Sequence, residues 1–235
     1  MAQTHIGTSA WLVRLLGGFE IESNKGVVDV PLAAQRVVAF LALNRRVARR
    51  SSLGALIWPD LDDVRARANL RSALWRLGQV TAMVVATPAT VRLADDVVVD
   101  LDGIDRTITP LQSGHGDGSL EPAALDLELL PGWDEPWVAF ERERLRQRQL
   151  HLLDTVIAAR LEEGRFGDSI DAAMRALKLD PYRESTHAAL LRAHVAGGNR
   201  IAALTHFKQF ATTMRTEMGL SPSVELNKLV RELLR

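Results

Sequence analysis

Residues 63–80, DVRARANLRSALWRLGQV, decide the fold of this chain because they combine helical periodicity with four arginines. Successive residues of a helix are rotated by about 100°, which makes one side of this segment apolar. That stripe consists of Ala66, Leu70, Ala73, Leu74 and Leu77. Asp62 and Asp63 favour a helix start here, and Gly78 is expected to end the helix. The segment is therefore predicted to form an amphipathic helix with a cationic outer side.

Two shorter helices are predicted before this one. LAAQRVVAFLALN, residues 32–44, places its apolar side chains on one helical face. SSLGALIW, residues 51–58, offers Ser51 or Ser52 as an N-cap. This second helix must end before Pro59, because proline disfavours a helical conformation of the residue that precedes it.

Short strands are predicted on both sides of the three helices. Residues 11–30 alternate apolar runs with turn signals, which indicates short antiparallel strands. AMVVAT (82–87) and TVRL (90–93) flank Pro88 and predict a hairpin, and VVVDL (97–101) follows as a further apolar run. The order of strands, three helices and hairpin is typical of a winged helix-turn-helix.

The chain from Trp137 onward is predicted to be helical, with self-similarity at a spacing of 34 residues. Ala159 matches Ala193, and Gly164 matches Gly198. Small residues at helix crossings and a glycine at each helix-to-helix turn are what tetratricopeptide-like hairpins require at this period. The expected helices span residues 137–163, 166–178, 183–196, 199–217 and 223–234.

The predicted fold class is an α+β N-terminal winged helix-turn-helix followed by an all-α tetratricopeptide-like helical bundle. The expected domains are residues 1–108 and 136–235, joined by a linker over residues 109–135 that is rich in glycine, proline and acidic residues. A chain truncated near Ser119 is expected to keep a folded winged helix, since that domain has its own core.

The net charge of the chain is zero, but the charge is unevenly distributed. Residues 32–93 carry ten arginines and three aspartates, a balance of 10 − 3 = +7, whereas residues 94–135 carry one arginine and eleven acidic residues, or 1 − 11 = −10. The first of these segments is suited to attract a polyanion, and the second would repel one.

Composition and motifs exclude several classes of function. The absence of cysteine removes disulfides, thiolate metal sites and cysteine nucleophiles. No G-x-S-x-G or H-E-x-x-H motif occurs, and His187 and His194 are too far apart along one predicted helix to form a zinc site. We expect no catalytic residues, no cofactor and no metal. The sequence shows no secretion signal and no membrane-spanning run, which indicates a cytoplasmic protein.

The candidate binding residues lie mainly on the cationic helix. Base reading is expected from Arg65, Asn69 and Ser72, because the first part of such a helix enters the major groove. Phosphate contacts are expected from Arg71, Arg76, Arg92 and the cluster Arg45, Arg46, Arg49 and Arg50. Arg67, nearer the apolar stripe, and Trp75 complete the DNA-binding set. The alternatives are an arginine-rich solvated face and, for Trp75, a side chain wedged against a neighbouring strand.

Several of these segments resemble a known family. LLGGFEI (15–21), AAQRVVAFLAL (33–43), SSLGALIWPDL (51–61) and RARANLRSALWRL (65–77) resemble the DNA-binding half of Streptomyces antibiotic regulatory proteins, which has an OmpR-like winged helix. LLPGWDEPWVAFERERLRQRQLHLLD (129–154) and MGLSPSVEL (218–226) resemble the bacterial transcriptional activator domain. This resemblance implies a sequence-specific transcriptional regulator rather than an enzyme. Such regulators are usually activators that bind repeated promoter sites and contact RNA polymerase. The implied partners are double-stranded promoter DNA, RNA polymerase and a second copy of the chain, with no membrane.

Two features depart from the family pattern where DNA would be touched. The hairpin tip, residues 87–90, lacks glycine and a basic residue, and Arg92 is the only cation expected nearby. Gly78 stands where relatives commonly continue with arginine. The alternative function is a protein-interaction module whose winged helix serves for dimerisation or docking. The excess of arginine over residues 32–93 favours DNA binding, since a docking surface has no need of it.

Overall fold

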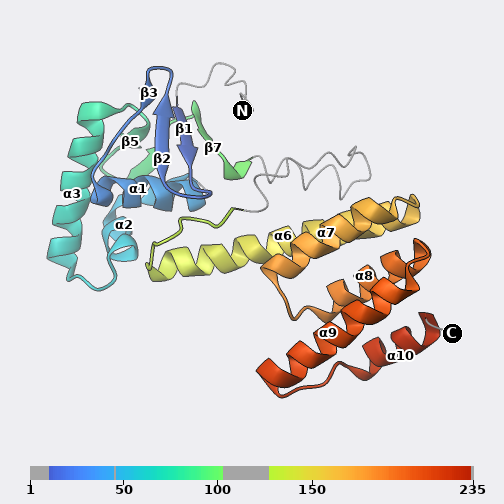
Figure 1. The fold of residues 1–235 in the computed structure, drawn as a ribbon. Helices are drawn as coiled ribbons and strands as arrows, with labels where there is room; N and C mark the ends of the chain where they lie inside the picture. Colours follow the sequence, from blue (N-terminus) through green and yellow to red (C-terminus); the bar gives the residue numbers. More distant parts are fainter. Residues whose placement is uncertain (1–10, 45, 103–126, 234–235) are drawn as a thin grey trace. The chain divides into compact units, whose positions relative to one another are not determined.

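The computed structural model describes residues 11–44, 46–102 and 127–233, whose course is shown in Figure 1. The chain divides into two compact units. Among the described residues, the first unit comprises everything up to residue 102 together with residues 127–143, and the second begins at Arg144. Arg45 and most of the predicted linker, residues 109–126, lie outside the described part of the chain.

The first unit contains a four-stranded sheet in the order β3-β2-β1-β7. Its strands are β1 (Trp11–Arg14), β2 (Glu20–Ser23), β3 (Gly26–Val27) and β7 (Val97–Val99). The antiparallel pairing of β1 with β2 and of β2 with β3 agrees with the sequence prediction, and β7 adds a parallel neighbour to β1. The Asp100 carboxylate accepts the N–H groups of Leu15 and Leu16, each at 2.9 Å, and so holds the chain that leaves β1.

Three helices lie between these strands in sequence: α1 (Leu32–Leu43), α2 (Arg50–Ile57) and α3 (Asp63–Val80). Helices α2 and α3 cross closely at Gly54, where a β-carbon would come within 3.0 Å of the Ala66 carbonyl oxygen. The prediction that Gly78 ends the third helix is wrong. Gly78 is not in the left-handed conformation that favours a helix end, and α3 continues to Val80.

The predicted hairpin is part of a three-stranded sheet in the order β4-β6-β5. It pairs β5 (Val84–Ala86) with β6 (Thr90–Leu93), and β4 (Val47–Arg49) adds to the other edge of β6. Strand β4 was not predicted, and it changes the start of α2. Arg49, the last residue of β4, occupies the N-cap position, so the prediction of Ser51 or Ser52 as the N-cap is wrong.

Residues 127–143 complete the core of the first unit. Leu129 forms a β-bridge with Leu16, and Leu129, Leu130 and Val138 are buried. Arg142 donates hydrogen bonds to the carbonyl oxygens of Leu129 at 3.0 Å and Leu130 at 2.9 Å. This segment therefore packs as part of the first unit, whereas the sequence places it across the linker and the start of the second domain.

An aromatic series strengthens the same contact. The ring centroids of Phe19 and Trp133 are 5.8 Å apart, those of Trp133 and Trp137 are 6.2 Å apart, and those of Trp137 and Phe40 are 5.3 Å apart. Aromatic pairs at such distances contribute beyond the area that they bury. Trp133 and Trp137 thus anchor residues 127–143 to the sheet and to α1. The division of the chain into residues 1–108, 109–135 and 136–235 stays a prediction.

The second unit is made of helices. Helix α6 (Pro136–Glu162) begins in the first unit, and α7 (Phe166–Leu179), α8 (Glu184–Ala196), α9 (Arg200–Met218) and α10 (Val224–Leu233) follow. Gly164 and Gly198 form the turns after α6 and α8 with φ of 72° and 80°, a conformation that glycine adopts readily. These turns confirm the repeat of 34 residues. Buried Ala172, Ala173 and Ala176 allow close packing of α7.

Candidate nucleic-acid interface

Helix α3 presents the face that the sequence predicted. Ala66, Leu70, Ala73 and Leu77 are at most 3% exposed and turn toward the core, while Leu74 is half-buried. The Asp62 side chain accepts the Arg65 N–H at 2.9 Å and fixes the first turn. Figure 1 shows α3 at the outer edge of the first unit, next to α1 and α2. The polar side of the helix is therefore open to solvent within this unit.

The four arginines of α3 are held to different degrees. Arg65 pairs with Asp62 at 3.4 Å and Arg67 with Asp63 at 2.9 Å, and these side chains are exposed, so the pairs are weak. Arg71 and Arg76 are exposed and form no ion pair or hydrogen bond with any residue that the structure describes. With Asp63 as the only acidic residue of α3, the helix carries 4 − 1 = +3 charges.

The uncharged candidates on α3 are spread around its outer side. Ser72 is exposed, whereas Asn69 is half-buried at the flank of the helix. Trp75 is 66% exposed. This exposure disfavours the alternative that Trp75 is wedged against a strand, and it leaves the indole free for a ligand.

The end of strand β4 and the start of α2 bring two further arginines to the hairpin tip. The Arg50 N–H donates to the Ala89 carbonyl at 2.9 Å, and its guanidinium donates to the Thr87 carbonyl at 3.1 Å. Arg49 is exposed and lies opposite Thr90 in the sheet. The prediction that Arg92 is the only cation near the tip is therefore wrong. It failed because the short segment 47–49 did not indicate that β4 pairs with β6.

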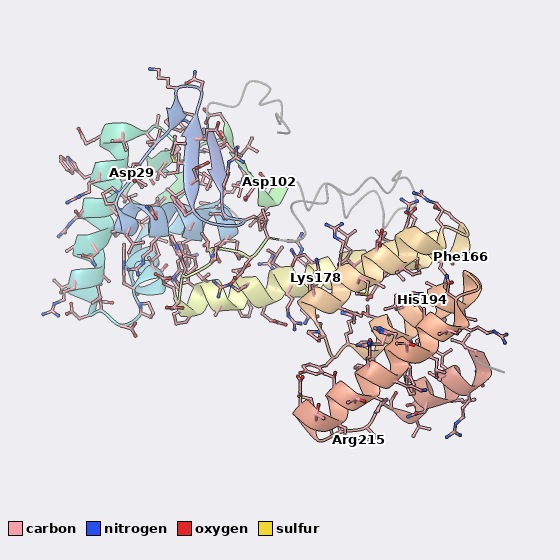
Figure 2. The ribbon with its side chains drawn as sticks, in the orientation of Figure 1. Asp29, Asp102, Phe166, Lys178, His194 and Arg215 are labelled. Atoms are coloured by element: carbon pink, nitrogen blue, oxygen red, sulfur yellow. The ribbon has the colours of Figure 1, made fainter. Side chains whose placement is uncertain are left out.

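The remaining basic candidates near the hairpin are already engaged. Arg92 pairs with Asp95 at 2.9 Å. The Arg46 guanidinium donates to the Val97 carbonyl at 2.7 Å and forms an ion pair with Asp102, which Figure 2 labels at the end of this part of the chain. Arg46 has a φ of 63° and joins α1 to the sheet, so its position serves the fold. Arg45, the remaining member of the cluster, lies outside the described residues.

Two histidines of the second unit, His187 and His206, form a packed pair between α8 and α9. His187 Nε2 donates to the Pro181 carbonyl at 2.9 Å, and His187 Nδ1 accepts a hydrogen bond from His206 Nε2 at 2.8 Å. The ring of His187 also stacks on Phe210 at a centroid distance of 3.6 Å. Burial and the neighbouring His187 lower the pKa of His206 to about 4. Burial also lowers the pKa of His187, so both rings are neutral near pH 7 and pack between the helices.

The described residues contain no cluster of three or more histidine or acidic side chains that could hold a metal ion. No helix among them is long and apolar enough to span a membrane. The candidate interface is the outer side of α3 together with the wing, which we define as β4, β5 and β6.

Known proteins share the domain, the sequence pattern and the fold. Residues 122–234 match the bacterial transcriptional activator domain. The regulatory protein AfsR of Streptomyces coelicolor is 25% identical over 217 residues, which cover 86% of this chain and 22% of AfsR. The chain thus spans about a fifth of the length of that relative.

A solved structure extends the comparison to the fold. Mycobacterium tuberculosis EmbR, determined in complex with a low-affinity phosphopeptide, superposes with a TM-score of 0.72 at 20% identity. The match covers 96% of this chain and 65% of the EmbR chain. This likeness confirms the predicted fold class, a winged helix followed by an all-α domain.

Proposed function

The chain carries a bacterial transcriptional activator domain and is a relative of the Streptomyces antibiotic regulatory proteins, as its sequence motifs predicted, and from that premise we propose that it binds duplex promoter DNA. Transcriptional regulation is the function of this family. The finer proposal is that α3 and the wing bind specific, repeated promoter sites and that the helical unit activates transcription through contact with RNA polymerase.

The observation that carries the proposal is the outer side of α3. Arg71 and Arg76 are exposed cations without a partner among the described residues, on a helix whose opposite side is buried. A protein gains from such unpaired arginines when they displace counterions from DNA phosphates. Arg49 and Arg50 add positive charge at the tip of the wing, where a duplex bound by α3 would pass.

The proposed contacts divide by geometry into base and phosphate readers. Arg65, Asn69 and Ser72 lie on the first part of α3 and are assigned to base edges. Phosphate contacts are assigned to Arg71, Arg76, Arg49, Arg50 and Arg67, and Trp75 is assigned to the edge of the groove. Arg45, outside the described residues, stays a phosphate-binding candidate from the sequence alone. Arg46 and Arg92 are the weakest candidates, because Asp102 and Asp95 already neutralise them.

The alternative is a protein-docking surface, and the exposed Trp75 favours it. Docking or dimerisation through α3 would depend on the indole and much less on Arg71 and Arg76. Substitution of Trp75 should impair docking, whereas substitution of Arg71 and Arg76 should impair DNA binding. The two kinds of variant therefore separate the two functions.

The test is selection of preferred sites from random duplex DNA by the full chain, followed by binding measurements at several salt concentrations. We expect a preferred site whose affinity falls about 10²- to 10³-fold between 50 mM and 200 mM salt, as five or so phosphate contacts imply. Arg71→Ala combined with Arg76→Ala should weaken binding to all sequences and lower the salt slope by about two units.

The matched control is Arg215→Ala, which removes an exposed arginine from α9 in the second unit. It should leave DNA affinity unchanged. Salt-independent binding, or an equal loss in the control, would reject the assignment of α3 to DNA. A reporter carrying the selected site tests activation, which should require residues 144–235.

A further inference from the structure

Three of the four side chains of α3 that point most directly away from the core of the first unit are apolar. The four buried residues of α3 define an inward direction, and rotation by about 100° per residue gives the direction opposite to it. Val64, Ala68 and Trp75 lie within about 30° of this outward direction, as does the polar Gln79 near the end of the helix. Arg65 and Asn69, which were predicted to read bases, lie about 70° and 110° away from it.

The exposure of the side chains agrees with this geometry. Val64 is 78% exposed and Ala68 is also exposed, although both are apolar. Valine is a poor helix former, because its branched side chain loses rotamer freedom in a helix. Val64 therefore gains nothing from burial and does not favour the helix that it occupies. A ligand that covers it would explain its presence.

The surroundings of Val64 and Ala68 indicate the chemistry of that ligand. Arg65, Arg67 and Arg71 flank the two side chains on α3, and the helix has a net charge of +3, from four arginines and Asp63. An apolar strip bordered by cations fits a partner whose outer edge is anionic and whose recessed surface carries methyl groups. The major groove of duplex DNA has this character, because each thymine presents a C5-methyl group between two phosphate backbones.

We infer that Val64 and Ala68 select thymine by packing against its C5-methyl group. This inference rests on the proposed DNA-binding function. The two residues are four positions apart, or about 6 Å along the helix, which is close to two base-pair steps of about 3.4 Å. They contact thymines two base-pair steps apart in the preferred site. Arg65 and Asn69, at the side of the helix, approach base edges and the backbone beside them.

Trp75 points in the same outward direction as Val64 and Ala68, but it does not contact the same part of the DNA. It lies 11 residues after Val64, about 16 Å along the helix, whereas the major groove is about 12 Å wide. When Val64 rests on the groove floor, the indole lies beyond the groove and packs on the sugar-phosphate edge. The contacts to thymine methyl groups are thus assigned to Val64 and Ala68 and not to Trp75.

The experiment replaces each thymine of the selected site, one at a time, with deoxyuridine, which removes only the methyl group. The wild-type chain should lose about three- to fivefold in affinity at one or two positions, as expected for one methyl group withdrawn from an apolar contact. Val64→Ser should abolish the loss at one of these positions, and Ala68→Ser at the other. Thermal unfolding should be unchanged, because both side chains are exposed.

Val224→Ser is the matched control. Val224 is also 78% exposed and lies at the start of α10 in the second unit. This variant should show the wild-type response to deoxyuridine. The inference is overturned if no deoxyuridine position weakens binding, or if the losses persist in Val64→Ser and Ala68→Ser.

Two further outcomes separate this inference from the function on which it rests. Absence of any preferred site in the wild-type chain would reject the proposed function together with the inference. A preferred site whose affinity depends on Arg71 and Arg76 but not on thymine methyl groups would reject the inference alone. If Val64→Ser left DNA binding unchanged but weakened self-association, the outward apolar side chains of α3 would instead bind a second copy of the chain.

Discussion

Helix α3 and the α8–α9 pair place their ionisable side chains in opposite ways. The arginines of α3 are exposed, and its buried side is entirely apolar. In contrast, His187 and His206 lie between two helices and hydrogen-bond each other at 2.8 Å. Arginine stays charged at all accessible pH values, whereas a buried histidine is held neutral. Helix α3 therefore keeps exposed charges that can bind a ligand, whereas the α8–α9 pair uses neutral polar side chains for packing.

The largest effect is expected from removal of residues 127–143, which complete the core of the first unit. A chain ending at Asp102 lacks buried Leu129, Leu130 and Val138, and it should lose at least about 5 kcal/mol, which is enough to unfold a small domain. The structure thus changes the expectation that a winged helix truncated near Ser119 folds. Urea unfolding followed by circular dichroism provides the measurement. The control is a chain ending at Glu143, which should unfold cooperatively, and equal stability of the two would show that residues 127–143 are dispensable.

The second prediction separates base contacts from phosphate contacts on α3. Arg65→Ala or Asn69→Ala should cost about 1 to 3 kcal/mol on the selected site and largely spare random DNA, because base contacts specify while phosphate contacts do not. Arg76→Ala should weaken both classes of DNA alike and lower the salt slope by about one unit. Competition binding at fixed salt measures both effects. Identical profiles for the three variants would show that α3 makes only phosphate contacts.

The third prediction concerns the histidine pair. The pKa of His206 is about 4 in the folded chain, against about 6.5 in the unfolded chain. Above pH 6.5 the ring is neutral in both states, so stability does not change. Between pH 6.5 and 4 the unfolded chain takes up the proton first, so the free energy of unfolding falls by up to about 1.4 kcal/mol per pH unit. The fall levels off below pH 4.

Chemical unfolding of the second unit at a series of pH values tests this slope. His206→Gln cannot take up the proton and should flatten most of the dependence in this window. DNA affinity should not depend on this substitution, because His206 is not among the proposed DNA-binding residues. A slope that persists in the variant would place the titrating group elsewhere.

The smallest effect is expected from Arg92→Ala. Arg92 already pairs with Asp95, whose side chain is 94% exposed, and such surface pairs contribute at most about 1 kcal/mol. We expect a change of less than about 0.5 kcal/mol in stability and little change in the salt slope of DNA binding. Arg49→Ala, on the same wing without such a pair, should lower the slope by about one unit. Equal slopes for the two variants would remove the distinction between paired and unpaired cations on the wing.

Local periodicity was enough to predict several elements of the fold. The buried side of α3, from Ala66 to Leu77, and the glycine turns at Gly164 and Gly198 were predicted because their signals repeat within one helix or one helical hairpin. The exposed positions of Arg71 and Arg76 followed from the same helical wheel. This part of the candidate site could be predicted because a helix has a fixed rotation per residue.

Contacts between segments far apart in the sequence could not be predicted and became visible only in the folded chain. Arg50 reaches the hairpin tip across 37 residues, and Arg46 is drawn to Asp102 across 56 residues. Residues 127–143 pack on the first unit although their motif belongs to the activator domain. These contacts depend on strand pairing and on which apolar surfaces remain to be covered, and neither leaves a periodic pattern in the segments concerned. The roles of Arg46 and Arg50 therefore became visible only when the strands that hold them were paired.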